Sequence, residues 1–130
     1  MKRLAIMTGA LFSIFLIAGL AQAAEVVLGP HDNGKEVRVQ AGEVLVLALE
    51  MQAGTGYLWE FHKLDGKHFE LVQSETKPLA DQAKVGGPML QVWRLKTRAP
   101  GEARLSLDYL RPWEGQAHAV KHFEVKVHIQ

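Results

Sequence analysis

The residue types that could do chemistry are few, and their spacing does not suit catalysis. Beyond residue 23 the only serines are Ser74 and Ser106, and neither lies in the G-x-S-x-G sequence of a nucleophile elbow. The chain has no cysteine, so it has no thiol nucleophile and no thiolate metal site. Residues 54–56 (Gly-Thr-Gly) lack the Gly-Lys-Ser/Thr that would complete a phosphate loop. We therefore expect no catalytic residue and no enzyme activity.

Histidine is the one residue type whose spacing suggests a metal site. His118, His122 and His128 are an even number of residues apart, so an extended strand would turn them to one face. Residues six apart on a strand are separated by roughly 20 Å, which is too far for one zinc ion. His62 and His68 flank a turn signal and could meet across it, but ordinary polar positions explain these residues too. We expect no metal site and no cofactor.

Three loops combine glycine, proline and aromatic residues in a way that suits binding. In residues 54–57 two glycines permit positive φ angles and let the backbone approach another surface closely. Residues 84–88, which contain Gly-Gly-Pro, form a second such loop, although both loops also suit ordinary turns. In residues 111–113 a proline stiffens the chain beside an Arg and a Trp, the residue types typical of interface hot spots. The alternative for this third loop is a Trp that caps the end of the core. The candidate binding residues are Gly54, Thr55, Gly56, Tyr57, Gly86, Gly87, Arg111, Pro112 and Trp113.

The elements that must position these loops are strands, because apolar residues recur at every second position. Phe123, Val125, Val127 and Ile129 alternate with polar residues, and residues 105–109, 37–39 and 57–61 alternate in the same way. Val44 to Leu49 is a continuous apolar run, which suits a strand covered on both faces. Turn signals recur every 8–15 residues. The pattern predicts an all-β, immunoglobulin-like β-sandwich of about 6–8 strands. Its core would contain Trp59, Trp93 and Phe123 and need no disulfide.

The N-terminus reads as a targeting segment. Lys2 and Arg3 precede an apolar stretch over residues 4–20, and Ala21-Gln22-Ala23 gives the small-x-small pattern of a cleavage site. We expect residues 1–23 to be a cleaved signal peptide and residues 24–130 to be one exported domain, periplasmic or secreted. An uncleaved membrane anchor is the alternative, since the apolar run is long. After cleavage the domain would have no membrane contact.

Charge excludes one class of partner. The formal net charge is +1, and Lys2 and Arg3 of the targeting segment more than account for it. Residues 24–130 contain no basic run or stripe, which argues against nucleic acid. A protein partner or a small ligand remains.

The loop motifs resemble those of the chagasin family of cysteine protease inhibitors. The third loop, Tyr109-Leu110-Arg111-Pro112-Trp113-Glu114, matches the family's Tyr-x-Arg-Pro-Trp-Glu in full. Thr55-Gly56-Tyr57 keeps the second half of the family's first loop, Asn-Pro-Thr-Thr-Gly-aromatic, and Gly86-Gly87 matches part of Gly-x-Gly-Gly. The departures are Gln52, Ala53 and Gly54 in the first loop and Lys84 in the second.

The resemblance implies a reversible, tight-binding inhibitor of papain-like cysteine proteases that works as a monomer. Its three loops would form a wedge at one end of the sandwich and occlude the active-site cleft without chemistry. Residues 54–57 would lie over the catalytic Cys and His of the target, with Thr55 as a central contact and Tyr57 packed at the loop base. The other two loops would grip the sides of the cleft. The lost proline and the added glycine predict a more flexible first loop, which affects potency and the preferred protease.

The altered first loop also favours an alternative. The same loops could serve an exported immunoglobulin-like binding module for a ligand other than a protease, such as a glycan or an envelope protein.

Overall fold

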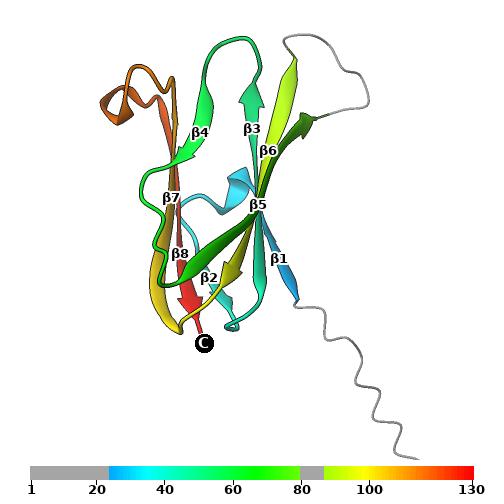
Figure 1. Cartoon of the computed structure of the whole chain (residues 1–130), viewed down its shortest axis with the longest axis vertical. Helices are drawn as coiled ribbons and strands as arrows, with labels where there is room; N and C mark the ends of the chain where they lie inside the picture. Colours follow the sequence, from blue (N-terminus) through cyan, green and yellow to red (C-terminus); the bar gives the residue numbers. More distant parts are fainter. Residues whose placement is uncertain (1–23, 80–86) are drawn as a thin grey trace, which may run out of the picture.

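The computed structural model describes residues 24–79 and 87–130, which form two β-sheets packed face to face (Figure 1). One sheet has the strand order β1-β3-β6-β5 and the other β2-β8-β7-β4. Two 3₁₀ turns, η1 (Pro30–Asp32) and η2 (Gln116–His118), lie in the β1–β2 and β7–β8 connections. The predicted all-β sandwich is confirmed. The strands of the described part are β1 (Glu25–Leu28), β2 (Glu36–Val39), β3 (Val44–Gln52), β4 (Leu58–Phe61), β5 (Phe69–Pro78), β6 (Pro88–Thr97), β7 (Gly101–Leu110) and β8 (Lys121–Ile129).

Each sheet combines antiparallel pairs with one short parallel pair. β3, β6 and β5 are antiparallel neighbours, as are β4, β7 and β8. β1 runs parallel to β3 but pairs only with Val44–Leu47, and β2 runs parallel to β8 but pairs only with Lys126–Ile129. In the described part of the chain, residues 48–52 of β3 and 121–125 of β8 therefore have no strand beside them on that side.

The core lies between the sheets and is built from alternate residues of the long strands. Leu45, Leu47 and Leu49 of β3 are at most 1% exposed. Burial of each such side chain stabilises the fold by about 1.5–3 kcal/mol. Trp59, Trp93 and Phe123 are buried in the same cluster, as the sequence predicts. The opposite sheet contributes Leu105, Leu107, Tyr109, Val125 and Val127.

Strands β5 and β6 are the two long elements that alternation does not predict. In β6 the adjacent residues Val92 and Trp93 are both buried, so its apolar pattern does not alternate. Residues 70–78 are all exposed, because β5 is the outer strand of its sheet. The register shifts between Leu71 and Gln73, so a β-bulge at Val72 breaks the period of two. A bulged, polar edge strand carries little sequence signal.

The amide of Gln91 joins the two sheets. Its Oε1 accepts a hydrogen bond from the backbone N–H of Trp59 at 2.7 Å, and its Nε2 donates to the Trp59 carbonyl at 3.2 Å. Trp59 belongs to β4, an edge strand of one sheet, whereas Gln91 belongs to β6 of the other. The Gln91 side chain therefore satisfies the backbone N–H and C=O of Trp59, as a neighbouring strand would.

Four of the six histidines, His62, His68, His122 and His128, pair with carboxylates. On the outer face of the β2-β8-β7-β4 sheet, the Asp108 carboxylate bonds His62 Nδ1 at 2.8 Å and His122 Nδ1 at 2.6 Å. His68 Nδ1 lies 2.6 Å from Asp65, so His62 and His68 bind different carboxylates and do not meet across the turn. In residues 24–79 and 87–130 no group of three or more metal-ligating side chains is placed to hold an ion. Within the same ranges no helix has the length and apolarity needed to span a bilayer.

The two histidines control the ionisation of Asp108, whose residue is only 5% exposed. Burial raises its pKa, but the hydrogen bonds from His62 and His122 lower it by more, so the pKa lies below the usual aspartate value. Because the folded pKa is lower than the unfolded one, the carboxylate stabilises the fold fully above the unfolded pKa of about 3.9. That contribution is lost as the pH falls through the folded pKa.

We expect Asp108→Asn to lower the free energy of unfolding at pH 7 by about 1–3 kcal/mol, because charged hydrogen bonds are lost. The difference from the unsubstituted protein should shrink as the pH falls below about 3.9 and through the lowered folded pKa of Asp108. Urea unfolding followed by tryptophan fluorescence between pH 2 and 7 measures this. Glu70→Gln, on exposed β5, is the control. Stability curves for Asp108→Asn and the unsubstituted protein that stay parallel across this range would show that Asp108 is not the titrating group.

Candidate functional site

Strand pairing brings the candidate loops to one end of the sandwich. Gln52 of β3 pairs with Pro88 of β6, and Leu58 of β4 pairs with Leu110 of β7. The β3–β4 loop, the start of β6 and the β7–β8 loop therefore lie together, at the top of Figure 1. Gly87, which precedes β6, is part of this end. Gly86 and Lys84 lie outside the described residues.

The first loop is held by hydrogen bonds through its own threonine. Thr55 Oγ1 donates to the Gln52 carbonyl at 2.8 Å and accepts from the Tyr57 N–H at 3.2 Å. Gly54 and Gly56 have φ angles of 81° and 82°, which a residue with a Cβ rarely adopts. The two glycines are therefore required by the backbone conformation, and Thr55 closes the turn between them.

The second loop contacts the first through the backbone. The Ala53 N–H donates to the Gly87 carbonyl at 3.4 Å, a long hydrogen bond. Ala53 is one of the positions where the sequence departs from the family pattern. The family pattern has proline at this position, and proline has no backbone N–H, so this hydrogen bond depends on the substitution.

The third loop presents Trp113 at the surface. The Glu114 N–H donates to the Arg111 carbonyl at 2.9 Å, which closes a turn around Pro112 and Trp113. Trp113 is 72% exposed, so it does not cap the core. Its ring lies against Gly56: a Cβ at Gly56 would come within 2.4 Å of the indole Cη2. The missing side chain of Gly56 thus makes room for the indole beside the first loop.

Arg111, which belongs to the third loop, holds the first loop in place. Its Nε donates to the Thr55 carbonyl at 3.1 Å, and its guanidinium lies 4.5 Å from the centroid of the Tyr57 ring. Its Nη1 is also 3.7 Å from a carboxylate oxygen of Glu114. We predict Arg111 as a binding residue, but in this structure its side chain is engaged within the molecule. It positions the loop.

Tyr57 packs at the base of the loop, as the family resemblance implies. It is partly buried against the core, and its ring stacks on Tyr109 with the centroids 5.5 Å apart. Tyr109 in turn lies 5.0 Å from Trp59. The hydroxyl of Tyr109 accepts the Gln52 N–H at 3.0 Å, at the point where the first loop begins. A continuous stack of rings therefore connects the core to the loop.

Tyr109 is the site residue that the sequence analysis missed. Alternation with Ser106 and Asp108 predicts it as a core residue, and it is only 6% exposed. Its contacts with Gln52 and Tyr57 cross more than 50 positions of sequence, and no local pattern encodes them. Its place in the Tyr-x-Arg-Pro-Trp-Glu motif was the only available signal.

The arrangement can bind but has no means of catalysis. Gly54, Thr55, Gly56 and Trp113, the residues at the tip, carry no charge, and the charges of Arg111 and Glu114 lie beside each other. An uncharged tip with one exposed indole suits a recess of matching shape in a protein partner.

Solved structures resemble this fold along most of the chain. The cysteine protease inhibitor EhICP2 from Entamoeba histolytica superposes with a TM-score of 0.74, at 23% identity over 82% of this chain and 96% of its own. PbICP-C, solved in complex with falcipain-2, gives a TM-score of 0.57 at 22% identity, over 82% of this chain and 99% of its own. At these identities the likeness establishes the fold alone.

The sequence comparisons establish the family. Chagasin from Trypanosoma cruzi is 26% identical over 96 residues, which cover 72% of this chain and 87% of that protein. The family model described as "Chagasin family peptidase inhibitor I42" matches residues 38–127, well over half of the chain. The match includes all three candidate loops, the five complete strands β3 to β7 and most of β8. The chain therefore belongs to the chagasin family of peptidase inhibitors, and it is not an enzyme.

Proposed function

We propose that this chain is a reversible, tight-binding inhibitor of papain-like cysteine proteases that occludes the active-site cleft with three loops. The observation that carries the proposal is the single tip formed by the first and third loops, with Trp113 72% exposed beside Gly56. Family membership supports inhibition of a peptidase. Two structural neighbours, a cysteine protease inhibitor and a protein solved in complex with falcipain-2, support the class of peptidase.

In this mechanism the first loop enters the cleft and lies over the catalytic Cys and His of the protease. Gly54 and Gly56 remove side-chain bulk, so the backbone of the loop approaches the cleft closely. The Gly86-Gly87 and Arg111-Pro112-Trp113 loops contact the two sides of the cleft. Substrate entry is blocked, and no peptide bond of the inhibitor is offered in a geometry suitable for attack.

Affinity requires that the loop is ordered before it binds. A loop with two glycines loses much conformational entropy when it is ordered, and the lost proline of the family pattern adds to that cost. Thr55 and Arg111 hold the same loop in the free protein. Their hydrogen bonds already order the loop in the unbound protein. Less conformational entropy is then lost on binding, so more of the contact energy contributes to affinity.

We further propose that this immunoglobulin-like domain is exported and that residues 1–23 are removed after Ala23. If so, the mass of the protein purified from the periplasm or the medium should correspond to residues 24–130. Ala23→Phe should block processing, because signal peptidase requires a small residue there. A full-length mass in the membrane fraction would instead support the uncleaved anchor.

Trp113→Ala should weaken inhibition of papain by about 2–4 kcal/mol, or roughly 30- to 800-fold in Ki, because the exposed indole is the largest apolar contact available at the tip. Inhibition titrations with a fluorogenic peptide substrate measure Ki for both forms. The stability of the variant should change little, since Trp113 lies outside the core. Equal Ki values would exclude Trp113 from the binding site.

Arg111→Met should weaken inhibition and also loosen the free protein. The variant keeps an apolar side chain but loses the hydrogen bond to Thr55 and the charge over Tyr57. We expect a rise of about tenfold in Ki, and backbone NMR order parameters of residues 54–56 falling toward about 0.6 from the value near 0.85 of rigid backbone.

Arg104→Met is the matched control, because Arg104 is also exposed and paired with a carboxylate but lies on a sheet face. It should leave both quantities unchanged. A raised Ki with unchanged order parameters would show that Arg111 contacts the protease directly and does not act through the loop.

A further inference from the structure

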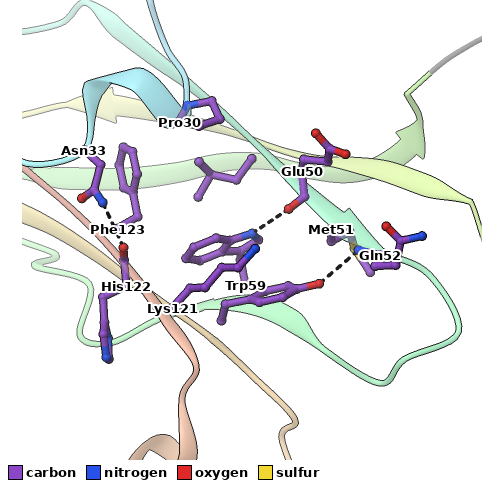
Figure 2. A pocket seen from close by; sticks show the side chains of 11 residues that line it. Pro30, Asn33, Glu50, Met51, Gln52, Trp59, Lys121, His122 and Phe123 are labelled. Carbon is purple, nitrogen blue, oxygen red and sulfur yellow. Dashed lines mark hydrogen bonds between the residues drawn. The ribbon is translucent and has the colours of Figure 1, made fainter.

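A pocket of about 620 Å³ opens between the two sheets, below the candidate site (Figure 2). It lies where residues 48–52 of β3 and 121–125 of β8 have no neighbouring strand on that side within the described part of the chain. Its volume falls in the range of small-molecule sites, about 300–1,000 Å³. Buried apolar groups form its floor, and exposed residues form its rim. The floor comes from Leu49, Trp59, Tyr109 and Phe123.

The backbone at the pocket walls is already hydrogen-bonded by side chains. On β3, the Glu50 carbonyl accepts the indole N–H of Trp59 at 3.0 Å, and the Gln52 N–H donates to the Tyr109 hydroxyl at 3.0 Å. An added peptide strand would have to displace these bonds, so strand addition to β3 is disfavoured.

The β8 wall is protected in the same way. The side-chain amide of Asn33 donates to the His122 carbonyl at 3.2 Å and accepts the Glu124 N–H at 2.9 Å. With both walls satisfied, an occupant has to be recognised by side chains in the pocket, which favours a small molecule over an extended peptide.

Lys121 supplies that recognition. Figure 2 shows its side chain reaching across the pocket beside Trp59, and its ammonium lies 5.3 Å from the centroid of the Tyr109 ring. Among residues 24–79 and 87–130 no carboxylate lies within ion-pair distance of this ammonium. A cation without a counterion, placed over an aromatic floor, is complementary to a ligand that has an anionic end and an apolar body.

We propose that this pocket binds a small apolar carboxylate, with the carboxylate on the Lys121 ammonium and the apolar body against Trp59 and Phe123. The oxygen of the Tyr109 hydroxyl accepts the Gln52 N–H, and its O–H is a second donor for the ligand. The proposal does not depend on protease inhibition, since the ligand contacts none of the tip residues.

The test is a titration of uniformly ¹⁵N-labelled protein with 3-phenylpropionate, followed by two-dimensional NMR. The indole N–H of Trp59 and the amides of Met51 and Lys121 should shift and saturate, with Kd on the order of 1 mM for a ligand of this size. The indole N–H signals of Trp93 and Trp113 should not move, because neither residue lines the pocket. Shifts that do not saturate, or that appear at Trp113, would overturn the proposal.

One change to the ligand and one change to the protein test the charge–charge contact between the carboxylate and Lys121. The neutral amide 3-phenylpropionamide should bind about tenfold more weakly than the acid, and Lys121→Met should weaken binding of the acid to the same extent. Lys96→Met is the matched control, since Lys96 is exposed on β6 and does not line the pocket. It should leave Kd unchanged. Equal affinity for acid and amide would refute the role of Lys121, whether or not the variant folds.

A peptide C-terminus is the alternative occupant, because it also joins a carboxylate to an apolar side chain. Titration with a hexapeptide that ends in phenylalanine tests this alternative. Saturable binding of the hexapeptide without any response to 3-phenylpropionate would overturn the small-molecule proposal.

Discussion

The end of the molecule that carries the candidate loops depends on one stack of rings. Trp59 is buried between the sheets, Tyr109 packs on it, Tyr57 stacks on Tyr109, and the guanidinium of Arg111 covers Tyr57. Each ring is fixed by the one below it, so the rigidity of the core extends to the surface. Without this stack the first loop would be held only by hydrogen bonds, those of Thr55 and those with Arg111 and Gly87.

The stack also explains how the chain tolerates its departures from the family pattern. Gln52 contacts Tyr109 through its backbone N–H, which the asparagine of the family pattern would also provide. Ala53 donates its N–H to Gly87, a bond that the proline of the family pattern could not make. Gly54 has the positive φ that suits glycine best. The loop is therefore held by backbone contacts at Gln52 and Ala53, and the altered side chains change the surface that it presents. Such a division allows target preference to vary on a constant scaffold.

Side chains complete the two sheets where strands are missing. The parallel strands β1 and β2 are short, and they leave half of β3 and half of β8 without a partner on one side in the described part of the chain. Asn33, Trp59 and Tyr109 bond the backbone groups that face this opening. An unpaired strand edge can pair with a strand of another chain, and these hydrogen bonds make such pairing less favourable. The pocket with Lys121 is the space that remains.

The sequence by itself determined the fold class and most of the strands, because a strand buried on one face requires an apolar residue at every second position. It also identified the Arg-Pro-Trp loop and hence the family, since these residue types in this order are rarely needed for packing. Strand β5 escaped prediction because an exposed edge with a bulge imposes no such period. The alternation also placed His62, His122 and Asp108 at polar positions, but it gave no sign that the three are joined.

Only the tertiary structure decided that Trp113 is exposed over Gly56, that Arg111 braces Thr55, and that Tyr109 supports the first loop. These contacts join residues that are more than 50 positions apart. They arise from the register of β3 with β6 and of β4 with β7, which aligns the loop ends. Register is a property of paired strands, and no single stretch of sequence specifies it.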